Sequence, residues 1–154
     1  MDELADLYDY ARAENIGVYN YSIGFSAAAS IREGTLRAVF LDFDQLRTVP
    51  EINEAAGHEQ GHHATGCYHK VDSPFETWER AEHRADRWFY EHYLSVDQFR
   101  AAFRAGCTEY WQLAEWFRLP EVRIKKALHY WVECRGVNFN YIYDDALYTN
   151  KSLG

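Results

Sequence analysis

The spacing of apolar residues changes twice along the N-terminal third of the chain. Apolar side chains recur every three or four positions over 4–14, which predicts a first helix. Alternation of apolar and polar residues over 18–23 predicts a strand, and apolar runs at 28–31 and 36–43 predict two more. We therefore expect a helix followed by a small sheet.

Helical spacing dominates the remainder of the chain. Further helices are predicted over 49–64, 73–94, 96–105, 109–117 and 120–134, whereas the aromatic tail over 138–148 fits neither helix nor strand. Pro50 suits the first turn of the helix at 49–64 and Gly66 its end, while Ser73-Pro74 suits the start of the next. Without repeats or linkers, 154 residues of this pattern predict one α+β domain. The helical part from about residue 95 is not expected to be an independent unit.

Composition narrows the functional classes. Hydrophobic residues make up 47% of the chain and aromatic residues 17%, which is enough for a sizeable core. A net charge of -8 disfavours nucleic acid as the main partner, because a phosphate-binding surface needs clustered Lys and Arg. Cys67, Cys107 and Cys134 are poor material for a disulfide framework, and no apolar run suits a signal peptide or a membrane span. A cytoplasmic protein is expected.

The sequence HEQGH at 58–62 is the strongest chemical signal in the chain. On a helix, positions i and i+4 share one face, so His58 and His62 can bind one metal ion. Glu59 then lies beside the open coordination position, where it can accept a proton from water, as in zinc hydrolases. His63 is rotated away from that face. With 7 His in the chain, a polar helix without a metal is the alternative, so a third ligand is needed.

A second pair of residues at i and i+4 follows about twenty positions downstream. Glu82 can supply the third ligand, which completes a set of two His and one Glu with one open position, and this set favours zinc. Asp86 can accept the outer ring N–H of His58 or His62 and so fix the orientation of that ring. Glu79, one turn earlier, is the rival third ligand, and a solvated helix of salt bridges is the alternative without a metal.

These two motifs resemble those of the ImmA/IrrE family of metallo-endopeptidases, especially its short members from Firmicutes and their mobile elements. The matching segments are Tyr8 to Ala11, His58 to His62, Thr65-Gly66, Ser73-Pro74-Phe75, Arg84 to Trp88 and Glu109 to Phe117. The resemblance implies a small N-terminal sheet packed on a mainly helical, zincin-like domain of the gluzincin type, with the metal between two helices. The family's zinc ligands fall on His58, His62 and Glu82. Its catalytic glutamate falls on Glu59.

Three departures from the family pattern bear on the two metal helices. Gln60 stands where an apolar residue is usual. Gly57 replaces a helix former, and glycine within a helix costs about 1 kcal/mol relative to alanine. Leu94-Ser95-Val96 stands where Leu-x-Pro commonly ends the second helix, so this end must be set differently. These changes concern helix stability and substrate fit more than metal binding.

The expected reaction is metal-assisted hydrolysis of a peptide bond. Zinc lowers the pKa of its water, and Glu59 accepts the proton and passes it to the leaving amine. The candidates for a donor that stabilises the oxyanion are Tyr68, His69, His92 and Tyr110. An extended substrate segment is expected to pair with an edge strand at 36–43. Since similar enzymes on mobile elements cut a repressor, the resemblance implies that the protein substrate is a cytoplasmic DNA-binding regulator.

Two other functions fit parts of the sequence. A metal-binding module could regulate a partner without proteolysis, as in a toxin-antitoxin pair, but a pure binder has no need for Glu59. The segment 111–131 also fits a helix-turn-helix with Arg123, Lys125 and Lys126 on its second helix. The apolar residues of this segment are expected to pack against the rest of the fold instead; they are Leu113, Ala114, Trp116, Phe117, Val122, Ala127, Leu128 and Trp131.

Overall fold

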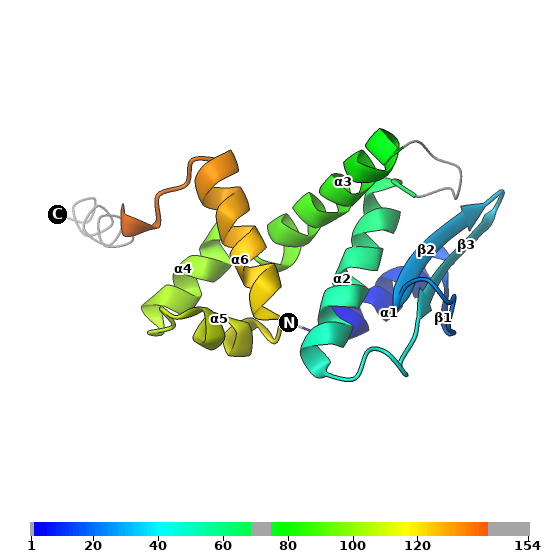
Figure 1. Ribbon diagram of the computed structural model, residues 1–154, viewed down its shortest axis with the longest axis horizontal. Coiled ribbons are helices and arrows are strands. Elements are labelled where there is room, and N and C mark those ends of the chain that lie inside the picture. Colours follow the sequence, from blue (N-terminus) through cyan, green and yellow to red (C-terminus); the bar gives the residue numbers. More distant parts are fainter. Residues whose placement is uncertain (1, 69–74, 142–154) are drawn as a thin grey trace.

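A helix, a three-stranded sheet and two long helices come first along the chain, and a group of shorter helices follows (Figure 1). The computed structural model describes residues 2–68 and 75–141. The strands are β1 (Gly17–Asn20), β2 (Ala28–Glu33) and β3 (Leu36–Leu41). The helices are α1 (Glu3–Glu14), α2 (Val49–Thr65), α3 (Phe75–Tyr93), α4 (Val96–Arg104), α5 (Tyr110–Phe117) and α6 (Glu121–His129), followed by a π-helical turn (Tyr130–Cys134) and a 3-10 turn (Phe139–Tyr141). The predicted α+β class is confirmed.

Local side-chain chemistry sets the ends of α2. The Thr48 hydroxyl accepts a hydrogen bond from the Glu51 N–H at 3.3 Å, and the Glu51 carboxylate accepts one from the Thr48 N–H at 3.1 Å. Pro50 occupies the first turn, and Gly66 ends the helix with a φ of 66°, so both predicted boundary signals are confirmed. The Ser73-Pro74 signal predicted for the start of α3 lies outside the described residues.

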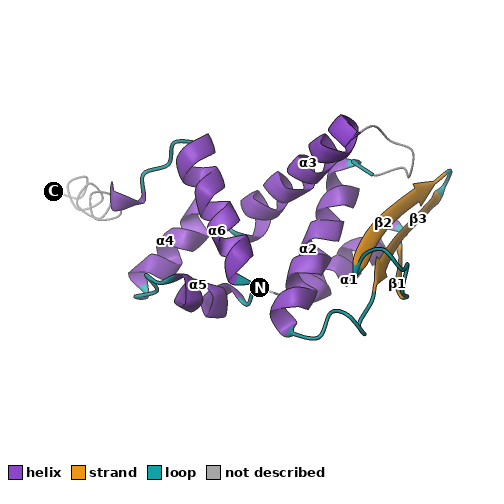
Figure 2. Cartoon of the chain, in the orientation of Figure 1, coloured by secondary structure: helices purple, strands orange, loops and turns teal. Residues whose placement is uncertain are grey.

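The sheet has the strand order β1-β3-β2, so β3 is its central strand (Figure 2). β1 pairs with β3 in parallel, and β2 pairs with it antiparallel through a turn at Gly34, whose φ is 58°. The prediction that 36–43 forms an edge strand available to a substrate is therefore wrong. β2 is the edge strand beside α2 instead. Apolar patterning indicates which side chains are buried but not which strands pair, so it could not give this order.

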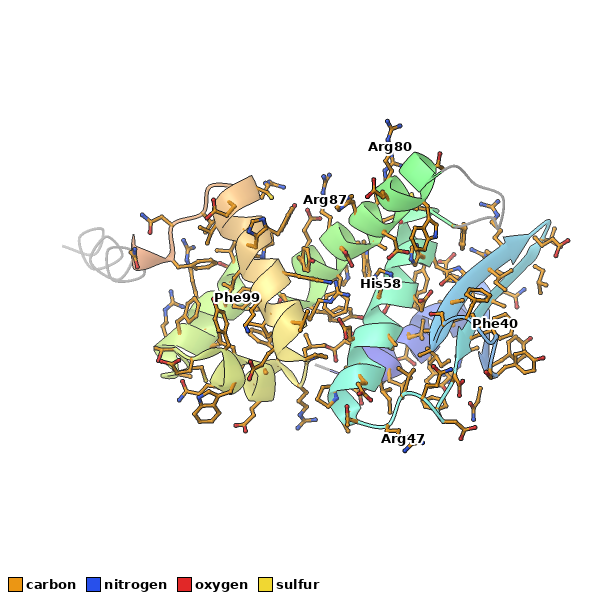
Figure 3. The ribbon with its side chains drawn as sticks, in the orientation of Figure 1. Phe40, Arg47, His58, Arg80, Arg87 and Phe99 are labelled. Carbon is orange, nitrogen blue, oxygen red and sulfur yellow. The ribbon has the colours of Figure 1, made fainter. Side chains whose placement is uncertain are left out.

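The helices α1 and α2 cover one face of the sheet and form a first core with it (Figure 1). The fully buried side chains of this core include Leu7, Val39, Leu41 and Ala56. The other face of the sheet carries Phe40 (Figure 3). Its ring stacks on that of Tyr19 with the ring centroids 5.7 Å apart. The alternation of side chains along β3 thus separates the core from an aromatic outer face.

The helices α4, α5 and α6 pack with the C-terminal half of α3 around a second core. Its buried side chains include Phe89, Tyr93, Leu94, Phe99, Leu113, Leu119, Ile124, Ala127 and Trp131. The helix-turn-helix order predicted for α5 and α6 is present, and Leu113, Ala127 and Trp131 are buried as expected. The same expectation was wrong for Trp116 and Val122, which are 50% and 59% exposed.

Hydrogen bonds around Leu94 and Ser95 set the junction between α3 and α4. Ser95 caps α4, since its hydroxyl accepts from the Gln98 N–H at 3.2 Å and the Gln98 side chain accepts from the Ser95 N–H at 2.8 Å. The indole N–H of Trp131 donates to the carbonyl of Leu94 at 2.7 Å. These hydrogen bonds use backbone groups that the helix end leaves without intrahelical partners.

The longest helix, α3, spans 19 residues and is rich in charged side chains. Its Arg80 and Arg87 point away from α2 (Figure 3). In the ranges that the structure describes, no helix has the length and apolar character needed to cross a membrane. The thiols of Cys67, Cys107 and Cys134 are all free.

Glu3 is a buried acid in the first turn of α1. Glu3 is 2% exposed, and its Oε2 has no hydrogen-bond partner within the described part of the chain. Burial raises the pKa of Glu3 from its ordinary 4.5 to about 7. Because the folded state disfavours the carboxylate, Glu3 lowers the stability of the protein increasingly as the pH rises from 4.5 through 7.

We predict that Glu3→Gln stabilises the protein more at pH 8 than at pH 5. The difference between the two pH values should reach about 2 to 3 kcal/mol, at about 1.4 kcal/mol for each unit of pKa shift. Urea denaturation of both proteins at both pH values measures it. Burial of the glutamine amide has the same free-energy cost at both pH values. An equal effect of the substitution at pH 5 and pH 8 would therefore contradict the raised pKa of Glu3.

Candidate metal centre

Two glycines allow α2 and α3 to lie close together. A Cβ at Gly61 would be 2.8 Å from the backbone carbonyl oxygen of Ala85, and a Cβ at Gly57 would overlap the ring of Phe89. Neither position has room for a side chain without a shift of α3. Gly57, which departs from the family pattern, therefore has a packing role that offsets its cost to helix stability.

This close approach brings His58, His62 and Glu82 together between α2 and α3. The position of His58 on α2 is labelled in Figure 3. The Nε2 atom of His58 lies 2.9 Å from Oε2 of Glu82, and Nε2 of His62 lies 3.1 Å from Oε1. The two Nε2 atoms are 3.0 Å apart. Among the described residues, these three form the only such group of His, Cys, Asp or Glu that could hold a metal ion. Glu79, the rival ligand, is exposed and outside it.

The outer nitrogens of both imidazoles contact acceptors. Nδ1 of His58 lies 3.1 Å from Oδ1 of Asp86, and Nδ1 of His62 lies 2.7 Å from the backbone carbonyl oxygen of Cys67. Each Nδ1 therefore carries a hydrogen, and in the neutral rings both Nε2 lone pairs point toward each other and toward Glu82. Such a convergence of acceptors is unfavourable unless a cation or a proton lies among them.

Zinc fits this donor set. Ligand atoms at about 2.0 to 2.1 Å from a tetrahedral zinc ion are about 3.3 Å apart, so each ligand would shift by only a few tenths of an ångström. In the protein without metal, a proton takes the place of the cation. Burial favours the neutral ring of His58, but hydrogen bonds to Asp86 and Glu82 outweigh burial and raise the pKa of His58 to about 10.

Asp86 contacts His58, one of the two histidines for which the sequence proposed it. Burial opposes ionisation of Asp86, yet the hydrogen bond from His58 and the charge of Arg123 lower the pKa of this carboxyl to about 2. The corresponding acceptor for Nδ1 of His62 is the backbone carbonyl of Cys67. The sequence did not predict this partner, because every residue carries such a carbonyl group. The left-handed turn at Gly66 carries that carbonyl back toward α2.

Glu59 lies one position after the first ligand and outside the ligand group. Glu59 is 5% exposed, and its Oε2 accepts a hydrogen bond from the Ser30 hydroxyl at 2.6 Å. The same hydroxyl lies 3.2 Å from the Glu59 backbone carbonyl oxygen. Ser30 belongs to β2, so this contact ties the predicted catalytic carboxylate to the edge strand. Nothing in the local sequence around Ser30 indicates this pairing over 29 positions.

The neighbours of the motif have partners of their own. Gln60 accepts a hydrogen bond from the Tyr93 hydroxyl at 2.7 Å, which explains a polar residue at a position that is usually apolar. His63 contacts the Ala38 carbonyl oxygen at 3.3 Å and the Tyr68 hydroxyl at 2.7 Å, so it faces β3 rather than the ligand group, as predicted. Burial lowers the pKa of His63 to about 4 and keeps its ring neutral.

The three oxyanion candidates that the structure describes are engaged elsewhere. Tyr68 is hydrogen-bonded to His63. His92 stacks on Trp88 with centroids 4.2 Å apart, and its ten-residue separation from Glu82 places it about 15 Å further along α3. The ring centroid of Tyr110 lies 5.0 Å from Nζ of Lys125. His69 lies outside the described residues. No candidate gains support from these contacts.

Arg123, which the helix-turn-helix interpretation placed on a DNA-binding surface, is 6% exposed. Its Nη1 donates to Oδ1 of Asp86 at 2.7 Å, and its Nε donates to Oε1 of Glu54 at 2.9 Å. The guanidinium also lies 4.9 Å from the centroid of the Phe89 ring. The DNA-binding interpretation of Arg123 is wrong. An available signal was its place on the apolar stripe of α6, four residues from each of the buried positions Leu119 and Ala127.

Comparisons of the chain with protein-family models, with curated proteins and with solved structures found no match. The structure thus defines an α+β protein in which two histidines and a glutamate could hold a metal ion.

We predict that Gly61→Ala damages the site through helix packing. The new methyl group would force α3 away from α2, which should lower the free energy of unfolding by about 1 to 3 kcal/mol. Displacement of Glu82 should also weaken zinc binding by about ten-fold or more, as expected when ligand orientation is lost. Chemical denaturation and competition with a chromophoric chelator measure the two effects.

A matched control is Ala64→Gly on the exposed side of the same helix. It should cost about 1 kcal/mol of stability through helix propensity alone and leave zinc affinity unchanged. If Gly61→Ala bound zinc as tightly as the control, close packing of α2 and α3 would not be needed for the site.

Proposed function

We propose that the protein is a zinc-dependent endopeptidase, similar to the ImmA/IrrE metallo-endopeptidases, with His58, His62 and Glu82 as the metal ligands. The observation that carries this proposal is the convergence of two Nε2 atoms and one carboxylate within 3.1 Å of one another. The adjacent Glu59 supplies a carboxylate that a hydrolase needs and a purely structural zinc site does not.

The reaction divides between the ion and the side chains. Zinc held by His58, His62 and Glu82 would supply Lewis acidity to a water molecule and to the carbonyl of the scissile bond. Glu59 accepts the proton of the water on its carboxylate and delivers it to the leaving amine. The Ser30 hydroxyl donates to Oε2 of Glu59, which fixes the direction of the carboxylate. The hydrogen bond from His58 to Asp86 fixes the orientation of the His58 ring.

The proposed substrate is an extended segment of a cytoplasmic protein, which adds as a further strand to the outer edge of β2. This edge is the suitable one because β2 carries Ser30 beside Glu59, whereas β3 is paired on both sides. Main-chain pairing requires the target segment to be unfolded or mobile before cleavage. By resemblance to the family, we propose a DNA-binding repressor of a mobile element as the protein that is cut.

The test is incubation of the zinc-loaded protein with a repressor encoded beside it, followed by mass spectrometry of the products. We expect cleavage at one site, loss of cleavage with a strong chelator and recovery on addition of zinc. A Pro substitution next to the cut site should reduce cleavage, because it removes a backbone donor. Cleavage that persists in chelator would contradict the proposal. Tight metal and repressor binding without cleavage would favour a regulatory metal-binding module.

A further inference from the structure

Arg123 joins the C-terminal helices to the metal centre through half-buried carboxylates on both α2 and α3. It projects from α6 and contacts Glu54 of α2 at 2.9 Å and Asp86 of α3 at 2.7 Å. Asp86 in turn contacts His58 of α2 at 3.1 Å. Since Glu54 and His58 are four residues apart on one face of α2, the contacts form a closed ring through three helices.

We infer that Arg123 is a positioning residue for the metal ligand His58, acting through Asp86. The inference rests on the proposed metal centre but not on the proposed peptidase activity. Its geometric basis is a shared atom: Oδ1 of Asp86 accepts from both Nη1 of Arg123 and Nδ1 of His58. Movement of Arg123 therefore moves the acceptor that fixes the direction of the His58 ring.

The guanidinium group suits this role in ways that an ammonium group does not. It donates in two directions from one rigid plane, through Nη1 to Asp86 and through Nε to Glu54. The plane also contacts the rings of Phe89 and Tyr90, at 4.9 and 5.9 Å from their centroids. Packing of this kind limits the side chain to one orientation, so the two carboxylates are held at a fixed separation.

This closed ring of contacts also links the C-terminal helices to the metal centre. Ile124 and Ala127 of α6 are fully buried in the second core, so the position of Arg123 depends on the packing of that core. The metal ligands come only from α2 and α3, yet α6 supplies the residue that aligns them. We expect mutations that loosen α6 to weaken metal binding without any contact with the ion.

Zinc affinity measured by competition with a chromophoric chelator tests this inference. Arg123→Lys keeps the charge and loses the planar fork, and it should weaken zinc binding by about ten- to a hundred-fold, the usual effect of losing an outer partner. Asp86→Asn should have an effect of similar size. In the Asp86→Asn protein, the further substitution Arg123→Lys should change affinity by less than about two-fold, because Arg123 acts through Asp86. Arg104→Lys, the same change at an exposed position, is the control and should have no effect.

Other outcomes would overturn the inference. If Arg123→Lys lowers the melting temperature but leaves zinc affinity unchanged, Arg123 is only a structural ion pair. If the two losses multiply in the double variant, Arg123 does not act through Asp86. Should Arg123→Lys fail to fold, Glu54→Gln replaces it in the same cycle and should give a smaller loss that also disappears in the Asp86→Asn protein. Absence of zinc binding by the unmodified protein would remove the metal centre and the proposed function together.

Discussion

Replacing Glu59 by glutamine is expected to abolish peptide-bond hydrolysis while zinc binding stays unchanged. The amide has nearly the shape of the carboxylate, but it cannot accept the proton of the attacking water. Loss of general-base catalysis should lower the rate by about 10² to 10⁴-fold. Because Glu59 lies outside the ligand group, the zinc content of the variant should equal that of the unmodified protein.

Ser30→Ala separates the chemistry of Glu59 from its orientation. This variant keeps the carboxylate and removes the hydroxyl that donates to it at 2.6 Å, so its rate should lie between those of the unmodified protein and of Glu59→Gln. Rates on one peptide substrate, together with metal analysis of each protein, give the comparison. Undiminished cleavage by Glu59→Gln would remove Glu59 from the mechanism.

The second large effect is expected for His62→Ala, which should empty the metal site. His62 is 3% exposed, and its ring is oriented by the Cys67 carbonyl at 2.7 Å. Among the described residues, the group that could hold a metal has no fourth His, Cys, Asp or Glu to replace its Nε2. Loss of a direct ligand should exceed the about ten- to hundred-fold weakening that follows loss of an outer partner. Metal analysis after dialysis against a weak chelator should find no zinc in this variant.

The adjacent histidine provides the control. His63 is buried like His62 but contacts β3 and Tyr68 instead of the ligand group. His63→Ala should lower stability, because it leaves the Tyr68 hydroxyl and the Ala38 carbonyl without these partners, yet it should keep zinc. Full zinc occupancy in His62→Ala, or loss of zinc only in His63→Ala, would contradict the assignment of ligands.

Local spacing predicted which side chains of the candidate site share a helix face, but it left Glu79 open beside Glu82 and did not show that the two helices meet. Residues His58 and His62 on one helix, and Glu82 and Asp86 on another, are each separated by four positions, and helical geometry alone puts both members of each pair on one face. The bounds of α2 were predictable for a related reason. Proline in the first turn and glycine past the last act through their own backbone preferences, which do not depend on the rest of the fold.

Contacts between distant segments were not predictable in this way. Ser30 meets Glu59 because β2 lies at the sheet edge beside α2, and apolar alternation does not specify strand order. Arg123 was considered only as a cation of the disfavoured helix-turn-helix alternative, because the sequence does not show the carboxylates on α2 and α3 that allow its charge to be buried. Gly57 was recognised only as a weak point of the helix, since the ring of Phe89 that excludes a side chain there comes from α3.

Anomalous diffraction at the zinc absorption edge, from crystals of the zinc-loaded protein, tests the metal centre most directly. The proposed metal centre predicts one strong peak between α2 and α3, within about 2.0 to 2.2 Å of Nε2 of His58, Nε2 of His62 and a carboxylate oxygen of Glu82. A peak bound by other residues, or no peak at these three side chains in a protein saturated with zinc, would contradict it.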